Sequence, residues 1–211
     1  MELFTYFRST ASYRVRLVMA YKGISSTPHY VNLRTNEQHH DYKQINPYGL
    51  VPALTTKQGI IFQSLSIIEY LETFHPTPPL WLNDPFQQAQ AMAIAQSICC
   101  DVHPLNNLRV LQYLTTTLNI TEEQKNAWYH HWVHEGFKPL EKQLEENSGK
   151  FCIQNHLSIA DMCLIPQVYN ANRFGVDMSP YPNIQRINET VLELEWTKAA
   201  TPEAQKDAIP Q

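Results

Sequence analysis

Features that would place the chain in a membrane or an export pathway are missing from its sequence. No apolar run approaches the roughly 20 residues that a membrane-spanning helix needs. The start, Met1–Phe4, enters a predicted strand and lacks the basic and apolar regions of a signal peptide. Internal repeats and low-complexity tracts are also absent. We therefore expect a soluble, cytoplasmic protein.

Cysteines are few, and their spacing matches neither a disulfide framework nor a zinc site. No Cys-x-x-Cys pair occurs, and adjacent cysteines rarely bridge. His130 and His134 are spaced to share a helix face, but the sequence supplies no obvious third ligand, so we expect no metal. The four cysteines are Cys99, Cys100, Cys152 and Cys163.

An excess of positive charge is missing too. With 16 basic and 20 acidic residues, the net charge of −4 argues against general nucleic-acid binding. The 211 residues are 43% hydrophobic and 17% charged, which is ordinary for a globular protein with a sizeable core.

The chain divides at a proline-rich linker, residues 75–85. Before it, strands and helices alternate, and the runs Leu50–Thr56 and Gly59–Phe62 predict a hairpin. This pattern predicts a mixed sheet with helices on its faces over residues 1–80. Residues 85–211 are predicted to form a second, helical domain.

Capping signals mark the helices of the second domain. Asp84 precedes a proline at a predicted helix start, and Thr121–Gln124 is a capping box for a helix to about residue 146. Ser158–Asp161 is a variant box, with Asp in place of the usual Glu. Pro104 should interrupt the first helix, and a last helix is predicted over Asn183–Thr197.

The segment Arg8–Arg16 joins a predicted strand, Leu3–Phe7, to a predicted helix, Ser12–Tyr21. This places the hydroxyl of Ser9 beside a helix N-terminus, where free N–H groups favour an anion. Such a junction can hold a thiolate. Alone, a serine before a helix is more often only a cap.

Two further segments extend this site. Pro52 must lie at a strand start or edge, where a cis bond is possible, and it leaves the main chain of Val51 to pair with an extended ligand. Gln63 and Ser64 precede another helix, which Ser64 or Ser66 can cap. Each signal alone has an ordinary structural explanation. Together they predict a peptide-sized thiol held at its sulfur, backbone and terminal carboxylate.

Here the chain resembles the zeta-class glutathione transferases, the class that includes maleylacetoacetate isomerase. The class motif Ser-Ser-Cys-Ser-x-Arg-Val-Arg corresponds to the segment Ser9–Arg16. Matching segments in the same order cover nearly the whole chain: Gly49–Ala53, Gln63–Leu65, Ile67–Leu71, His103–Asn107, Ala160–Asp161, Pro166–Val168, Arg173–Asp177 and Pro180–Pro182.

The resemblance implies a glutathione transferase fold: a thioredoxin-like domain with a mixed four-stranded sheet, then a helical bundle that forms the substrate pocket. It implies glutathione as cofactor and a homodimer. Ser9 would be the main donor to the thiolate, with Thr10 also catalytic and Ser12 a further candidate. Asp161 would be a structural cap rather than a catalytic residue. Val51, Gln63 and Ser64 would bind the rest of the glutathione.

Ala11 departs from the class motif, because it replaces the motif cysteine. A mechanism that needs a nucleophilic protein thiol would be lost with that cysteine. A mechanism in which glutathione itself attacks survives the change.

Three arginines indicate the substrate. Arg8, Arg109 and Arg173 can each form a bidentate hydrogen bond with a carboxylate. The alternative for each of them is an ordinary guanidinium exposed to solvent. Arg173 lies in the segment that the family places over the active site, where it would also be catalytic. Arg14 and Arg16 are predicted to point off the first helix in a structural or dimer-contact role.

A cis dicarboxylic enone fits these arginines, so the resemblance implies isomerisation of maleylacetoacetate to fumarylacetoacetate in tyrosine and phenylalanine breakdown. Maleylpyruvate isomerisation, general transferase or peroxidase activity, and a non-catalytic interaction module are the alternatives. His103 has two candidate roles, lining the pocket or only preceding the kink at Pro104, and the roles of Asn106 and Asn107 stay open.

Overall fold

The computed structural model describes residues 1–33, 35, 37–39 and 41–208, and they form two compact units. The first unit comprises Met1–Leu80 together with the C-terminal segment that begins at Leu192. The second unit is Trp81–Val191. The domain boundaries predicted from the sequence, 1–80 and 85–211, stay a prediction. By packing, the C-terminal segment belongs with the first unit.

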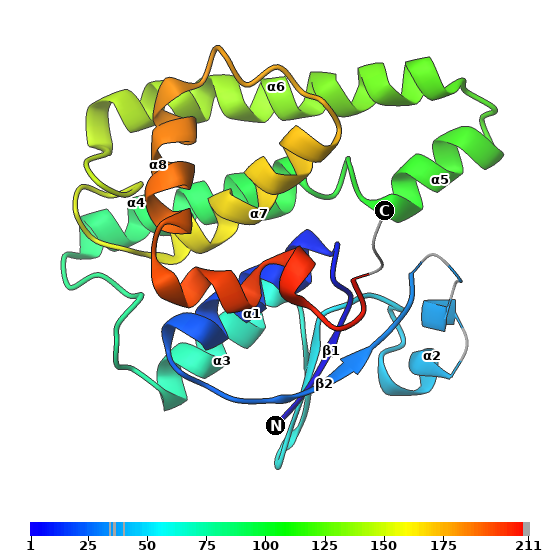
Figure 1. Ribbon diagram of the computed structural model, residues 1–211, viewed down its shortest axis with the longest axis horizontal. Helices are drawn as coiled ribbons and strands as arrows, with labels where there is room; N and C mark the ends of the chain where they lie inside the picture. The colour runs from blue at the N-terminus through cyan, green and yellow to red at the C-terminus, as the bar shows by residue number, and fades with distance from the viewer. Residues whose placement is uncertain (34, 36, 40, 209–211) are drawn as a thin grey trace. The chain divides into compact units, whose positions relative to one another are not determined.

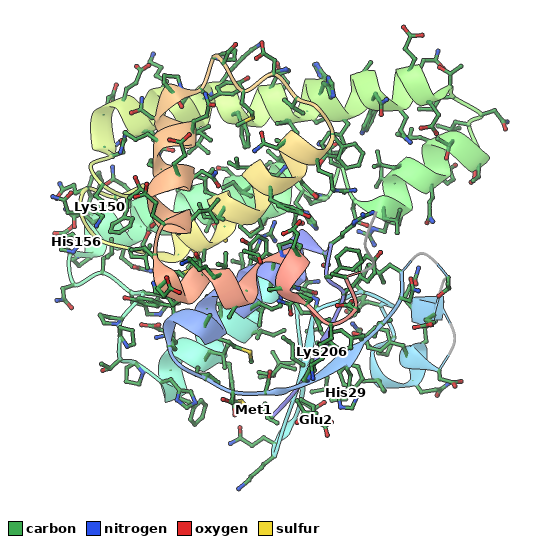
Figure 2. All side chains as sticks on the ribbon, viewed as in Figure 1. Met1, Glu2, His29, Lys150, His156 and Lys206 are labelled. Atoms are coloured by element: carbon green, nitrogen blue, oxygen red, sulfur yellow. The ribbon has the colours of Figure 1, made fainter. Side chains whose placement is uncertain are left out.

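A mixed four-stranded sheet is the centre of the first unit, with the strand order β2-β1-β3-β4 (Figure 1). β1 (Glu2–Thr5) pairs in parallel with β2 (Thr27–Tyr30) and antiparallel with β3 (Ala53–Thr56). β4 (Gly59–Phe62) returns antiparallel to β3, which confirms the predicted hairpin. Across the parallel pair of β1 and β2, the Nε2 of His29 lies 3.6 Å from a carboxylate oxygen of Glu2, and both residues are labelled in Figure 2.

The strand directions bring three segments to one edge of the sheet. β1 ends at this edge, the antiparallel β3 starts there, and β4 ends there. Phe4 pairs with Ala53, and Ala53 pairs with Phe62. The chain just after β1, just before β3 and just after β4 therefore meets at the same edge, and these are the three segments that the sequence selects.

Two helices cover one face of the sheet, and a short one lies on the other side (Figure 1). α1 (Thr10–Tyr21) packs on α3 (Ser64–Phe74), and α3 packs on β3 and β4. The short helices η1 (Glu37–His39) and α2 (Tyr42–Ile45) occupy the segment between β2 and β3. This is the predicted thioredoxin-like arrangement.

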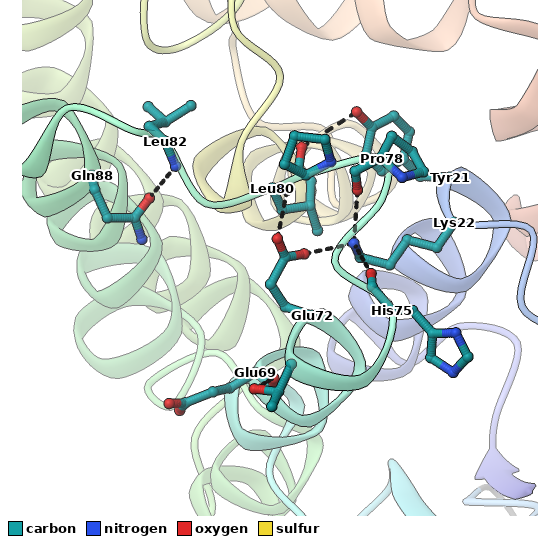
Figure 3. A network of polar contacts seen from close by, with 11 residues as sticks. Tyr21, Lys22, Glu69, Glu72, His75, Pro78, Leu80, Leu82 and Gln88 are labelled. Atoms are coloured by element: carbon teal, nitrogen blue, oxygen red, sulfur yellow. Dashed lines mark hydrogen bonds and ion pairs between the residues drawn. The ribbon is translucent and has the colours of Figure 1, made fainter.

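A buried ion pair ties α1, α3 and the following linker together (Figure 3). The ammonium of Lys22 lies 2.6 Å from a carboxylate oxygen of Glu72, and the exposed fractions of the two side chains are 0% and 6%. Lys22 also donates to the carbonyls of His75 and Pro78, both at 2.7 Å. Glu72 accepts the N–H of Leu80 at 3.0 Å. The linker is thus fixed to the first unit up to Leu80.

The second unit is helical, and its predicted caps are confirmed. Asp84 caps α4 (Pro85–Gln96), and Thr121 forms a reciprocal capping box with Gln124 at the start of α6 (Glu122–Asn147). Ser158 and Asp161 form the box of α7 (Ile159–Arg173). The remaining elements of this unit are η2 (Ser97–Val102), α5 (Leu108–Thr116) and α8 (Pro182–Leu192).

Asp161 is structural, as predicted. Its side chain is fully buried and accepts the N–H groups of Cys152 and Ser158, both at 2.8 Å. Burial raises the pKa of this carboxyl, and the donated hydrogen bonds oppose that shift. The first helix of the unit also breaks as predicted, since η2 is a π-helical segment that ends just before Pro104.

The prediction of one last helix over Asn183–Thr197 is wrong in its extent. α8 ends at Leu192, and the chain turns into η3 (Glu195–Ala200) and then η4 (Pro202–Ala204). The reason is tertiary packing: η3 lies against α1, where Thr197 and Ala200 are buried. None of the helices among the described residues is both long and apolar enough to cross a membrane.

We predict that Lys22→Met lowers the free energy of unfolding by about 3–5 kcal/mol, because it leaves the Glu72 carboxylate buried without its cation. Urea unfolding followed by circular dichroism measures this. The double variant Lys22→Met/Glu72→Gln should recover part of the loss, since the amide oxygen can still accept from Leu80.

The matched control is Lys198→Met, which removes an exposed ion pair with Glu195. The side chain of Lys198 is 64% exposed, and that of Glu195 is 84% exposed. We expect it to cost less than about 1 kcal/mol. Equal losses in the Lys22 and Lys198 variants would contradict the anchoring role of the buried pair.

Candidate functional site

Ser9 is the residue that caps α1. Its hydroxyl oxygen accepts the N–H of Ser12 at 3.2 Å, and its own N–H donates to the carbonyl of Tyr6 at 3.0 Å. The cap uses an acceptor site of the oxygen and leaves the hydroxyl hydrogen able to donate. Ser9 is half-buried, whereas Thr10 is only 2% exposed. The geometry therefore favours Ser9 as the thiolate donor.

Arg16 holds the backbone that leads into Ser9. Its guanidinium donates to the carbonyls of Tyr6 at 3.3 Å and Phe7 at 3.0 Å, and to the hydroxyl of Thr5 at 3.2 Å. Its Nε donates to the carbonyl of Ala200 at 3.1 Å. Arg16 is 7% exposed, so it points into the first unit rather than off the helix. Its role is structural, as one of the two sequence interpretations has it.

Val51 lies just before β3, outside the sheet ladder, and the Val51–Pro52 bond is cis. The Val51 side chain is buried in a cluster that includes Tyr6 and Phe7. The backbone before Ser9 and the backbone before β3 are therefore neighbours. This arrangement leaves the main chain of Val51 beside the Ser9 loop.

The start of α3 has an unusual backbone. Gln63 is the N-cap residue, with φ at +69°, and in the described part of the chain no side chain makes a capping hydrogen bond to this helix. The predicted cap by Ser64 or Ser66 is wrong, because the helix already begins at Ser64. A positive φ at a residue other than glycine costs free energy, and such positions gather at functional sites. The N–H groups of the first turn are thus left for another acceptor.

Arg14 is the site residue that sequence reasoning missed. Its side chain is 1% exposed, and its Nη1 donates to the hydroxyl of Ser64 at 3.3 Å. Its Nε and Nη2 are buried with no hydrogen-bond partner among the residues that the structure describes. Arg14 therefore does not point off the helix. The signal available in the sequence was its apolar setting, since Val15 and Leu17–Met19 follow it, and in the structure residues 12–19 of α1 are all buried.

These observations describe a site for an anion at the start of α3. A buried guanidinium without a carboxylate is costly, and so is a helix N-terminus without a cap. The guanidinium of Arg14 and the N-terminus of α3 meet at Ser64, which is 6% exposed. The Ser64 hydroxyl accepts a hydrogen bond from Arg14 and can donate its own hydrogen to a ligand. Ser12, between Ser9 and Arg14 on α1, also has a buried hydroxyl oxygen without a described partner. The donors fit a carboxylate near Ser64 and an anionic sulfur near Ser9.

Arg173 is the last residue of α7 in the second unit. It is exposed, its Nε donates to the side-chain oxygen of Asn170 at 3.2 Å, and its guanidinium carbon lies 4.5 Å from the ring centre of Phe174. Phe174 stacks on Tyr129 with ring centres 3.8 Å apart. A hydrogen bond and a stacked ring thus set the direction of the guanidinium.

The other second-unit candidates lie around the break after η2. His103 is half-buried, and its Nε2 lies 3.5 Å from the side-chain nitrogen of Asn107. Asn107 caps α5 by accepting the N–H of Arg109, whose side chain is exposed. Asn106 is buried and donates to the carbonyl of Tyr129 at 3.2 Å. Asn106 and Asn107 therefore have structural contacts of their own.

The predicted site residues are shared between the two units. Arg8, Ser9, Thr10, Val51, Gln63 and Ser64 belong to the first unit, and His103, Arg109 and Arg173 belong to the second. Within the first unit, Arg8 is half-buried, with its guanidinium carbon 5.0 Å from the ring centre of Phe7.

Histidines of α6 have partners other than a metal. The Nε2 of His130 lies 2.7 Å from the carbonyl of Phe174, and the Nδ1 of His134 lies 2.6 Å from the hydroxyl of Tyr181. In the part of the chain that the structure describes, no three His, Cys, Asp or Glu side chains gather as metal ligands would.

Comparison with protein families gives two matches that together span most of the chain. Residues 8–73 match the N-terminal domain of glutathione S-transferase. Residues 108–199 match the C-terminal domain of glutathione S-transferase.

Individual relatives cover nearly the full length. A probable maleylacetoacetate isomerase of Vibrio cholerae is 44% identical over 98% of this chain and 97% of its own. A bacterial zeta-class glutathione S-transferase solved as holo maleylpyruvate isomerase superposes with a TM-score of 0.96, at 37% identity over 99% and 100% of the two chains. A maleylacetoacetate isomerase from Methylobacterium extorquens AM1, solved with malonate and glutathione, has a TM-score of 0.96 at 34% identity over 100% of both chains.

Arg14, which is buried with no counter-charge among the described residues, gives a prediction about stability without any added ligand. We expect Arg14→Met to leave the free energy of unfolding unchanged or to raise it by about 1 kcal/mol, because it removes a buried charge that lacks a counter-charge. Ser64→Ala should lower it by about 1–3 kcal/mol, because the buried guanidinium then loses its acceptor. Chemical denaturation measures both, and a loss of several kcal/mol in Arg14→Met would contradict this view of the site.

Proposed function

Because the chain belongs to the zeta-class glutathione transferases, we propose that it is a glutathione-dependent isomerase that converts maleylacetoacetate to fumarylacetoacetate. The single observation that carries the proposal is the set of unused donors on the first unit: the Ser9 hydroxyl, the uncapped start of α3 and the buried Arg14. Together they suit a thiol compound that carries a carboxylate.

Ser9, with Thr10 beside it, would stabilise the thiolate of glutathione. A thiol of pKa about 8.5 is mostly protonated at neutral pH, and a decrease of about two units needs roughly 2.7 kcal/mol. A hydrogen bond from a hydroxyl to a charged group supplies about 1.5–3 kcal/mol, and a helix N-terminus adds about 0.3–1 kcal/mol. These two contributions suffice without a protein base. The cysteine that Ala11 replaces is therefore not needed.

The remaining contacts would fix the tripeptide at its backbone and one end. The main chain of Val51, outside the ladder of β3, would pair with the extended backbone. Gln63, Ser64 and the N–H groups of α3 would hold a terminal carboxylate, with the Arg14 charge behind Ser64.

When bound, glutathione supplies the nucleophilic thiolate that adds reversibly to the cis double bond, so that rotation and expulsion of the sulfur give the trans isomer. The protein supplies the positive charge that the substrate needs. Arg8, Arg109 and Arg173 would hold the two carboxylates of the substrate and oppose the negative charge that develops on the enone oxygen. His103 would bind the same substrate. The Methylobacterium relative was solved with both malonate and glutathione bound, which supports a dicarboxylate substrate.

Maleylpyruvate isomerisation is the second candidate. It is favoured by the relative solved as maleylpyruvate isomerase, whose fold matches this chain with a TM-score of 0.96. The same residues would serve, because both substrates are cis enones with two carboxylates. Placement in tyrosine and phenylalanine breakdown goes with the first substrate. We propose a cytoplasmic setting for either one. For either substrate we propose a homodimer, which light scattering during gel filtration tests.

The deciding experiment measures turnover of maleylacetoacetate and of maleylpyruvate, each with and without glutathione. We expect isomerisation of one substrate only when glutathione is present. Ser9→Ala should lower kcat/KM by about 100-fold or more, as removal of a donor to a reacting anion does. Arg173→Ala should lower it by a similar factor through loss of a carboxylate contact.

Ser25→Ala and Arg186→Ala are the matched controls, since both positions are exposed and neither belongs to the proposed site. They should keep the rate of the unchanged chain. Isomerisation that persists without glutathione, or that survives in Ser9→Ala, contradicts the mechanism. Glutathione binding without any isomerisation would replace the isomerase proposal with conjugation, peroxidase activity or a binding role.

Arg14 gives a separate prediction about affinity. Arg14→Met should weaken glutathione binding about 10- to 100-fold in calorimetry, because Ser64 and the helix start lose the charge behind them. The truncated thiols γ-glutamylcysteine and cysteinylglycine each lack one end of the tripeptide. The one that lacks the carboxylate bound at α3 should bind equally to both proteins. Equal weakening for all three thiols would show that Arg14 acts only on the fold.

A further inference from the structure

The C-terminal segment contacts the backbone that carries Ser9, although the two are about 200 residues apart in the chain. The N–H of Phe7 donates to a carboxylate oxygen of Asp207 at 3.0 Å. The next residue, Ala208, packs against the cluster that contains Tyr6 and Val51. Both contacts lie within the first unit.

This segment acts on the Ser9 loop from two directions. Asp207 holds the N–H of Phe7, while Arg16 holds the carbonyl of the same residue. Arg16 is in turn fixed by the carbonyl of Ala200. The peptide groups on both sides of Phe7 are therefore restrained by residues of the C-terminal segment or by a side chain that this segment fixes.

Burying part of the Asp207 carboxylate costs free energy, which suggests that its position has a role. It is half-buried, and one of its oxygens is buried without a hydrogen-bond partner among the described residues. Burial raises the pKa of this carboxyl, and the Phe7 N–H and the charge of Arg16 oppose that shift. A residue whose only role was to lie on the surface would have no reason to bury a carboxylate oxygen.

The residues that Asp207 restrains are the two that lead into the proposed chemistry. Arg8 and Ser9 follow Phe7 directly, and the Ser9 N–H is bonded to the carbonyl of Tyr6 in the same turn. A hydrogen bond from a hydroxyl to a sulfur anion depends steeply on distance and angle, so a small shift of the turn changes the stabilisation of the thiolate.

We propose that Asp207 is a positioning residue: it fixes the turn from Tyr6 to Ser9 so that the Ser9 hydroxyl meets the glutathione sulfur. The proposal rests on the proposed function, because it assigns Asp207 a part in holding the thiolate. It gives the C-terminal segment a role in activity, in addition to its packing on α1.

The test compares Asp207→Ala, Asp207→Asn and Lys206→Ala in the full chain. Lys206, labelled in Figure 2, is the exposed neighbour and the matched control. The principal readout is the pKa of the enzyme-bound glutathione thiol, followed by the ultraviolet absorbance of the thiolate as pH is varied. The isomerisation rate and the melting temperature are measured beside it.

We expect Asp207→Ala to raise the pKa of the bound thiol by about half a unit or more and to lower kcat/KM about tenfold. Asp207→Asn keeps an acceptor oxygen for the Phe7 N–H and should recover much of both effects. Lys206→Ala should match the unchanged chain. If Asp207→Ala does not fold, the smaller shift expected in Asp207→Asn decides the question.

Two results would overturn the proposal. One is a lower melting temperature in the Asp207 variants with an unchanged thiol pKa and rate, which would make the contact purely structural. The other is an equal effect in Lys206→Ala. A chain without substitutions that forms no thiolate with glutathione would instead refute the proposed function, so the two failures are distinguishable.

Discussion

The buried guanidinium of Arg16 is the constraint on which the first unit depends. It gives hydrogen bonds to the end of β1, to the turn before α1 and to the C-terminal segment. Without these donors, the carbonyls of Tyr6 and Phe7 would be desolvated and unpaired, and an unsatisfied buried polar group costs about 1–3 kcal/mol. The turn before Ser9, the start of α1 and the C-terminal segment at Ala200 are therefore all held by the same side chain.

Two buried arginines on α1 differ in their hydrogen-bond partners. Arg16 has acceptors from several segments, whereas Arg14, two residues earlier, donates to Ser64 and has two nitrogens without a partner among the described residues. In a folded core, polar groups are normally satisfied, so the exception marks a place built for a ligand. The positive φ of Gln63 and the uncapped start of α3 are exceptions of the same kind. Three departures from ordinary packing thus gather around one serine.

Local signals made much of the fold predictable from the sequence. The capping boxes at Thr121 and Ser158, the cap at Asp84 and the hairpin after Pro52 depend on residues within a few positions of each other, and the structure confirms them. The misses depend on tertiary contacts. The last helix ends early because η3 packs on α1, and Arg14 points inward because α1 is buried on all sides. In the candidate site, Ser9, Val51 and Ser64 could be selected from turn and cap chemistry, but no pattern links Asp207 to Phe7 across the length of the chain.

The unpaired charge of Arg14 has a consequence for the lifetime of the protein. A ligand that binds only the folded chain shifts the folding equilibrium by mass action, by about 2.7 kcal/mol at a concentration one hundred times its dissociation constant. That is a large part of the 5–15 kcal/mol by which a domain is typically stable. On the proposed function, the supply of glutathione would set the amount of folded protein as well as its rate. Thiol depletion would then expose the chain to unfolding and proteolysis before any residue of the site had changed.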